Sequence, residues 1–304
     1  MPKALKAESF EARARAKAAP GSHAPGPEDE GHGPRPLIID SGRNPLAAGM
    51  RELWSHRELL FFLAWRDVKV RYKQTALGAA WAILQPFMTM VVFSLLFGRL
   101  AKVPSDGVPY PVFAYAGLLP WTFFSNTAGT GGNSLVNNAS LITKVYFPRM
   151  VIPGAVVLAG LADFGLAALI LFGMIAWYGL NPGLALLMLP ALIVLLTVLA
   201  AAVAMWFAAL NVHYRDVRHA LPFILQLLLY LTPIIYPVSF VPARWRWVLR
   251  LNPLSGIIQG FRSALLGRPF DWDGLGISAA LTAAILAYAL WSFRRMEQGF
   301  ADVI

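Results

Sequence analysis

The 304-residue chain contains no cysteine and little charge. The absence of cysteine excludes disulfides, thiolate metal sites and cysteine nucleophiles. Charged residues make up only 14% of the chain, whereas apolar residues make up 57% and the mean hydropathy is +0.56. These values lie well outside the balance of a soluble domain. The composition therefore predicts a protein that crosses the membrane several times.

Motifs for catalysis and nucleotide binding are also missing. There is no Gly-Lys dipeptide, which excludes a Walker A loop, and neither HExxH nor GxSxG occurs. The five histidines lie in tails and loops, apart from His56 on an expected helix, and they form no metal constellation. We therefore predict no catalytic residue, no metal site and no cofactor in this chain.

Six apolar runs are long enough to cross about 30 Å of hydrocarbon. They cover residues 77–100, 112–132, 151–178, 184–210, 221–240 and 275–293. A further run, 253–267, is too short and too polar to cross, and is typical of a re-entrant or interfacial segment. We therefore expect an all-α membrane protein, with six transmembrane helices and outer re-entrant helices in residues 76–304.

The distribution of basic residues predicts the orientation. If both termini are cytoplasmic, 19 of the 26 lysines and arginines lie on the inner side. Five of the other seven lie in one outer segment, residues 244–268, which weakens this bias. Since the net charge of +10 mostly reflects this asymmetry and the basic tail, it does not indicate binding to nucleic acid.

The segment before the first span divides into two parts. Residues 1–45 are rich in Ala, Pro, Gly and charge and have little to bury, so we expect a disordered tail without a signal peptide. Residues 46–75 place apolar residues near helical spacing, with charged residues available for the opposite face. This pattern favours an amphipathic helix in the membrane interface over a soluble helix, because the chain has no other soluble domain to pack against.

Two polar features near the spans allow alternative interpretations. The inner loop at 133–149 could form a short exposed helix that contacts a partner, or Lys144 and Arg149 could serve only as positive-inside anchors. Asp163 falls near the middle of the third run. An acid at that depth marks a cavity or a proton path, or else it is satisfied by a hydrogen bond or ion pair between helices.

The first and fifth runs carry polar and aromatic residues along one face. Amides and aromatic rings suit sugars, whose apolar ring faces stack on aromatic side chains. The alternative is that the polar residues hydrogen-bond helices together. The candidates for a substrate path are Gln85, Thr89, Phe223, Gln226, Tyr230 and Tyr236.

Five segments, in the expected order, resemble the membrane subunit of ABC exporters for polysaccharides and polyol phosphates. They are RDVKVRYKQTALGAAWAILQP at 66–86, LITKVYFPRMVIP at 141–153, NVHYRDV at 211–217, TPIIYP at 232–237 and LNPLSGIIQGFRSALLG at 251–267. Each segment alone is modest, but the ordered set is specific and covers about residues 46 to 300.

The resemblance implies a homodimeric channel in the bacterial inner membrane, driven by two copies of a separate ATPase that binds ATP and magnesium. It implies that the path forms at the dimer interface, largely from the first and fifth spans. The helix before the first span resembles the family's gate helix, and the loop after the second resembles its coupling helix. The segment 253–267 resembles the outer helices that close the exit. The substrate implied is a glycan on an undecaprenyl diphosphate lipid.

Two sets of candidate residues follow from the resemblance together with charge. Basic residues near the expected entrance are suited to an anionic diphosphate headgroup, although each can equally serve as an interfacial anchor. These residues are Arg66, Lys69, Arg71 and Lys73. The expected contact with the ATPase consists of Lys144, Tyr146, Phe147 and Arg149.

Three alternative functions remain open. An exporter of capsule or teichoic-acid polymer would share these motifs. An ABC exporter of a small lipid or drug would share the six-span plan, but usually carries a larger outer domain. A membrane-embedded glycosyltransferase would need clustered acids, whereas Asp163 is the one acid inside an expected span.

Overall fold

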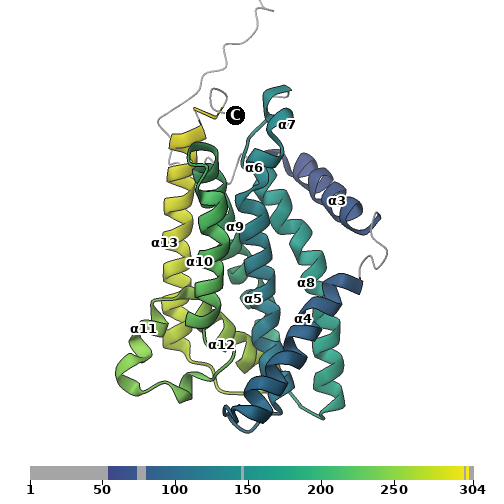
Figure 1. Ribbon diagram of the computed structural model, residues 1–304, viewed down its shortest axis with the longest axis vertical. Coiled ribbons are helices and arrows are strands. Elements are labelled where there is room, and N and C mark those ends of the chain that lie inside the picture. Colours follow the sequence, from purple (N-terminus) through teal and green to yellow (C-terminus); the bar gives the residue numbers. More distant parts are fainter. Residues whose placement is uncertain (1–53, 74–79, 145–146, 298, 301–304) are drawn as a thin grey trace, which may run out of the picture. The chain divides into compact units, whose positions relative to one another are not determined.

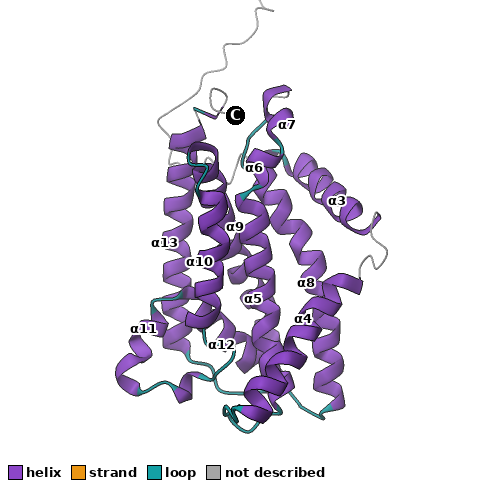
Figure 2. Ribbon diagram, viewed as in Figure 1, coloured by secondary structure: helices purple, strands orange, loops and turns teal. Residues whose placement is uncertain are grey.

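The computed structural model describes residues 54–73, 80–144, 147–297, 299 and 300 (Figure 1). All of them belong to one compact unit, residues 43–304. Every regular element in this described part is a helix, which confirms the all-α prediction there (Figure 2). The expected disordered tail, residues 1–45, lies outside the described residues.

In chain order, the α-helices are α3 (Arg57–Lys73), α4 (Ala80–Phe93), α5 (Tyr110–Gly132), α6 (Ser134–Asn137), α7 (Ala139–Lys144), α8 (Val151–Trp177), α9 (Leu189–His213), α10 (Val217–Leu231), α11 (Arg246–Arg250), α12 (Pro253–Leu266) and α13 (Trp272–Glu297). A π-helix, η1 (Ser94–Leu100), continues α4, and short 3₁₀ turns lie at η2 (Gly183–Met188), η3 (Val238–Phe240) and η4 (Ala243–Trp245).

Within the described residues, four helical segments are long and apolar enough to cross a membrane. They are Ala80–Leu100, Val151–Trp177, Gly183–His213 and Trp272–Glu297, and they match the first, third, fourth and sixth predicted spans. Helix α5 matches the second and has 23 residues, which is about 35 Å at 1.5 Å per residue. It is more polar than the other four because its last turns read SNTAGTGG.

The fifth predicted span ends earlier than expected. The apolar run extends to Phe240, but α10 stops at Leu231 after 15 residues. Thr232 precedes Pro233 and adopts an extended conformation, with φ −89° and ψ 136°. A proline disfavours the helical conformation of the residue before it, which fits the end of α10 at this position. The boundary predicted from the length of the apolar run was therefore wrong.

A buried arginine on α12 satisfies the backbone freed where α10 ends. Arg262 is only 2% exposed and donates from Nη1 to the Pro233 carbonyl (2.6 Å) and from Nη2 to the Ile234 carbonyl (2.5 Å). Its guanidinium carbon lies 3.7 Å from the centre of the Phe113 ring on α5. Because irregular backbone inside a membrane protein needs internal partners, Arg262 makes this break in the helix possible.

Helix α5 forms the centre of the bundle. It packs against α4, α8, α9, α10 and α12, and most of its residues are buried. Small residues permit a close approach: a Cβ added at Gly131 would lie 2.6 Å from the Cβ of Ala204 on α9. Such small-residue contacts are the usual means by which membrane helices pack closely.

Helix α3 has two different apolar faces. Leu63 and Ala64 are buried against the start of α8. Phe61 and Trp65 are 68% and 59% exposed. The exposed Lys69 follows Trp65 by four residues, so it shares the exposed aromatic face. The prediction that charged residues lie on the face opposite the apolar ones is therefore wrong at Lys69, which shares a face with Phe61 and Trp65.

The two ends of the bundle hold different segments. Figure 1 shows α6, α7 and the C-terminal end of α13 at one end, and α11 and α12 at the other. The segments predicted to be cytoplasmic are thereby separated from those predicted to be outer.

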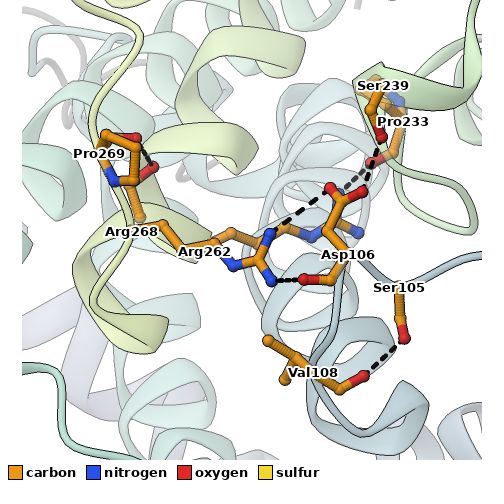
Figure 3. Close-up of polar contacts among 9 residues, drawn as sticks. Ser105, Asp106, Val108, Pro233, Ser239, Arg262, Arg268 and Pro269 are labelled. Atoms are coloured by element: carbon orange, nitrogen blue, oxygen red, sulfur yellow. Dashed lines mark hydrogen bonds and ion pairs between the residues drawn. The ribbon is translucent and has the colours of Figure 1, made fainter.

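Asp106 joins three segments at the end that holds α11 and α12 (Figure 3). It lies in the loop between η1 and α5 and accepts a hydrogen bond from the Ser239 hydroxyl (2.7 Å). Its carboxylate also pairs with Arg268, which follows α12, at 3.5 Å. Arg250 lies 4.0 Å from Asp271. Together with the buried Arg262, these contacts show that several arginines of the segment 244–268 have structural roles.

Candidate functional site: a polar cavity between α3, α4, α5 and α8

A cavity of about 670 Å³ lies where α4, α5 and α8 meet the C-terminal end of α3. Polar and apolar side chains line it together. The polar lining includes Arg71, Tyr72, Gln85, Thr122, Asn126, Thr130 and Asp163, and the aromatic lining includes Trp81, Phe123 and Phe164. An apolar bundle with such a cavity can hold a ligand that has both hydroxyl groups and apolar surface.

Asp163 connects this cavity to α3. One oxygen of its carboxylate accepts a hydrogen bond from Arg71 Nη1, and the other accepts one from the Tyr72 hydroxyl. Both α3 residues precede α4, whereas Asp163 lies near the middle of α8. The sequence analysis left two interpretations of Asp163 open, a pair between helices or a position in a cavity. The structure shows both, because Asp163 is paired with Arg71 and also lines the cavity.

The ion pair shows how much of the length of α8 is in contact with α3. Leu63 belongs to the same buried cluster as Val151, in the first turn of α8, while Arg71 reaches Asp163. Twelve residues of helix separate these two positions on α8, which corresponds to about 18 Å. Contacts of α3 therefore extend along nearly half of α8 and are not confined to its first turn.

A polar stripe on α5 lines the same cavity and was missed by the sequence analysis. Thr122, Asn126 and Thr130 are spaced by four residues, which places them on one face of the helix. Asn126 and Thr130 are exposed although α5 is otherwise largely buried. The repeat Thr-x₃-Asn-x₃-Thr within an apolar run is a signal that would have revealed this stripe.

The substrate-path candidates separate into two groups. Gln85 on α4 lines the cavity. Thr89 donates a hydrogen bond to the Gln85 carbonyl (2.9 Å) within the same helix and does not belong to the lining.

The α10 candidates lie elsewhere. Phe223 and Tyr230 are 62% and 57% exposed, and Gln226 between them is also exposed. Tyr236 follows the end of α10, and its hydroxyl donates to the Tyr230 carbonyl (3.3 Å). None of these four residues lines the cavity within this single chain.

The headgroup candidates differ in their availability. Arg66 donates from Nε (3.0 Å) and Nη2 (2.8 Å) to its neighbour Asp67, and Arg71 is paired with Asp163. Lys69 and Lys73 are exposed, and neither makes a hydrogen bond or ion pair to another described residue. The two lysines are therefore the more accessible cations of this set.

The ATPase-contact candidates lie at the end that holds α7. Lys144 is exposed at the end of α7, and Phe147 is partly buried among α3, α8 and α9 residues. The Arg149 guanidinium donates to the Glu297 carbonyl at the end of α13 and lies 5.6 Å from the Phe300 ring. Tyr146 lies outside the described residues.

The described residues contain no group of three or more His, Asp or Glu side chains arranged for a metal ion. The lining of the cavity offers hydrogen-bonding groups, the Asp163 pair and aromatic surface.

An apolar helical bundle with a polar cavity is compatible with a membrane transport protein, and comparison with known families shows which one. Residues 58–266 match the family described as ABC-2 type transporter. This match covers more than half of the chain, so the chain belongs to that family and is its membrane-spanning permease component.

Similar proteins have names that refer to polysaccharides. The O-antigen export system permease protein RfbA of Myxococcus xanthus is 31% identical over 259 residues, which cover 84% of this chain and 98% of that protein. The RfbA protein of Klebsiella pneumoniae is 26% identical over 248 residues, with coverages of 81% and 95%. The polysialic acid transport protein KpsM of Escherichia coli is 24% identical over 240 residues, with coverages of 77% and 91%.

Proposed function

We propose that the chain is the channel subunit of an ATP-driven exporter that moves a lipid-linked, O-antigen-like polysaccharide from the cytoplasm across the bacterial inner membrane. The observation that carries this proposal is the similarity to an O-antigen export permease along 98% of that protein's length. A separate subunit supplies ATP hydrolysis with magnesium, because this chain has no phosphate-binding loop.

The exposed faces of α4 and α10 support a homodimer of six-span subunits. Apolar and aromatic residues of α4 such as Trp81 (57% exposed) and Met88 (46%) remain uncovered in one chain. Phe223 and Leu227 of α10 are 62% and 46% exposed. Both helices flank α5 in Figure 1. A second copy that packs on this side would enclose Gln85 and the α10 candidates in one passage.

The composition of the cavity suits a glycan. A polymer rich in hydroxyl groups cannot cross hydrocarbon without hydrogen-bonding partners, and the polar stripe of α5 supplies them. Trp81 and Phe123 provide surfaces on which sugar rings can stack. We therefore place the glycan along α4 and α5, beside the cavity.

The lipid diphosphate enters at α3 in this proposal. Lys69 and Lys73 attract the anionic headgroup from the cytoplasmic leaflet, and Arg71 is released from Asp163 to bind it. The carboxylate and the diphosphate then compete for one guanidinium, so headgroup binding loosens α3 from α8. Lys144 and the loop after it carry the response to the ATPase.

Deletion and reconstitution test the function. Removal of the gene from its host should abolish the surface polysaccharide and leave the lipid-linked precursor inside, and the intact gene should restore export. In liposomes that contain the chain and its ATPase, the lipid-linked glycan should stimulate ATP hydrolysis. Normal surface polysaccharide in the deletion strain, or no response to the lipid-linked glycan, would refute the proposal.

An exporter of capsule polymer is the second candidate, since KpsM is also similar to this chain. The same reconstitution separates the two, because each exporter responds to its own precursor. Stimulation of ATP hydrolysis by a small lipid or drug, and not by a glycan, would favour an ABC exporter of small lipids or drugs. Glycosyl transfer by the purified chain would indicate a glycosyltransferase.

A further inference from the structure

A second, smaller cavity lies at the opposite end of the bundle from α7. It has a volume of about 160 Å³ and is enclosed by α11, α12 and the start of α13. Its polar lining consists of Arg246, Arg250, Ser255, Gln259 and Asp271. A space of this size corresponds to about five water molecules at ~30 Å³ each, or to one sugar ring. It is separate from the cavity beside Asp163, with which it shares no lining residue.

Two polar residues on α12 line this cavity without using their hydrogen-bonding capacity. Ser255 is only 5% exposed, and its hydroxyl has no hydrogen-bond partner in the described part of the chain. Gln259 is half-buried, and its amide makes no hydrogen bond to any described residue. The two residues are four apart and therefore share one face of α12. The Ser255 hydroxyl oxygen is closed to solvent, so the free hydrogen-bonding capacity that reaches the cavity is that of the Gln259 amide.

The charged residues of the lining are held in position by the backbone. Arg246 donates from Nε to the Val241 carbonyl (2.9 Å) and from Nη2 to the Ser239 carbonyl (3.3 Å). The Asp271 carboxylate accepts from the Gly274 backbone N–H (3.0 Å) at the start of α13. Arg250 approaches the same carboxylate only to 4.0 Å, and both side chains are nearly half exposed. The mouth of the cavity therefore presents donors and an acceptor to solvent.

We infer that this cavity is a binding subsite for one monosaccharide unit of a glycan. The guanidinium groups donate to sugar oxygens, Asp271 accepts from sugar hydroxyls, and the Gln259 amide does both. Trp245 and Trp247, which belong to η4 and α11, are 54% and 60% exposed and provide stacking surface for the neighbouring units. The inference rests on the proposed function for its biological role: the subsite holds the polymer where it leaves the membrane.

The test uses the full chain in lipid nanodiscs and free methyl glycosides of mannose, galactose and rhamnose as probes. Saturation-transfer NMR detects contact between the protein and each sugar, with glycerol as a non-sugar control. We expect at least one glycoside to bind with a dissociation constant on the order of millimolar, as is usual for so small a ligand in an open site. Glycerol should give no signal.

Variants locate the contact. Gln259→Leu preserves the size of the side chain but removes its amide, and Arg250→Ala removes one donor; each should reduce the signal at least several-fold. Arg244→Ala is the matched control, because Arg244 is in the same segment but does not line the cavity. Thermal unfolding of each variant verifies that the fold is retained. A signal that is equal in all variants, or no signal from any glycoside, would overturn the inference.

The outcome is independent of the test of export. Sugar binding at this cavity in a chain that exports no polysaccharide would refute the proposed function alone. Export of polysaccharide without any sugar contact at the cavity would refute the subsite alone.

Discussion

Two arginines illustrate how differently charge is held in this bundle. Arg262 is buried, and backbone carbonyls and the Phe113 ring surround it. Arg71 is 40% exposed and is paired with the Asp163 carboxylate beside a large cavity. Carbonyls freed by a broken helix have no alternative partner, whereas a carboxylate can be displaced by another anion. The comparison indicates a fixed framework around Arg262 and a breakable contact at Arg71.

The largest effect is expected from Arg262→Ala. The change leaves the Pro233 and Ile234 carbonyls unpaired and opens a cavity against Phe113, so it should cost about 3–5 kcal/mol of stability. Thermal unfolding in detergent and the yield of membrane-inserted protein measure this loss. Arg244→Ala, an exposed arginine nearby, should have little effect. Equal stability of both variants would show that Arg262 does not hold the end of α10.

A smaller loss of stability is expected when an extra methyl group is placed against Arg262. A Cβ at Gly117 would lie 2.7 Å from Arg262 Nη2, so Gly117→Ala should destabilise the protein by about 1–3 kcal/mol. Gly165→Ala on α8 is the matched control, since no atom lies within 4 Å of the added Cβ. That change should be neutral or slightly stabilising. Unfolding curves of the two variants that coincide would contradict the packing described here.

The Arg71 pair should matter for function more than for stability. Asp163→Asn should change the stability by about 1 kcal/mol or less, because the pair is partly exposed. Stimulation of the ATPase by the lipid-linked glycan should nevertheless fall several-fold, since the C-terminal end of α3 loses its ion pair with α8. Asp67→Asn on α3 is the control, because among the described residues Asp67 pairs with its neighbour Arg66 and not with α8.

A double variant sharpens this prediction. If the two residues act through their contact, Arg71→Ala combined with Asp163→Asn should be no worse than the more severe single change. Full stimulation in Asp163→Asn would remove the functional role of the pair.

The smallest structural effect is expected at Lys144. It is exposed at the end of α7, so Lys144→Glu should leave the unfolding temperature unchanged but uncouple ATP hydrolysis from export. Arg149→Glu should also lower stability, because the Arg149 guanidinium contacts the end of α13. Co-purification of the ATPase verifies assembly. Normal coupling in Lys144→Glu would exclude this residue from the ATPase contact.

Local signals in the sequence predicted most of the helices, but not which residues of different helices contact one another. The apolar runs identified four spans directly, because a helix that crosses hydrocarbon must be long and apolar. Pro233 was a signal for the end of α10 but not a sufficient one, because Pro86 and Pro120 lie inside α4 and α5. The polar stripe at Thr122, Asn126 and Thr130 was likewise readable from its spacing.

Contacts between residues far apart in the chain could not be predicted from the sequence. Asp163 was visible as an unusual acid in a span, yet its partner Arg71 lies 92 residues earlier. The role of Arg262 depended on where α10 ends and on Phe113 in another helix. Periodicity reports on one helix at a time, so it cannot show which of several nearby cations reaches a given carboxylate.

The central claim is that the glycan passes along α4 and α5, beside the Asp163 cavity. Photo-crosslinking in living cells tests it most directly, with a benzoylphenylalanine residue introduced at Asn126 and, as a control, at the exposed Leu169 of α8. The account predicts glycan adducts at position 126 during export, none at 169, and loss of adducts when the ATPase is inactivated. Continued export without an adduct at 126, or equal adducts at both positions, would contradict it.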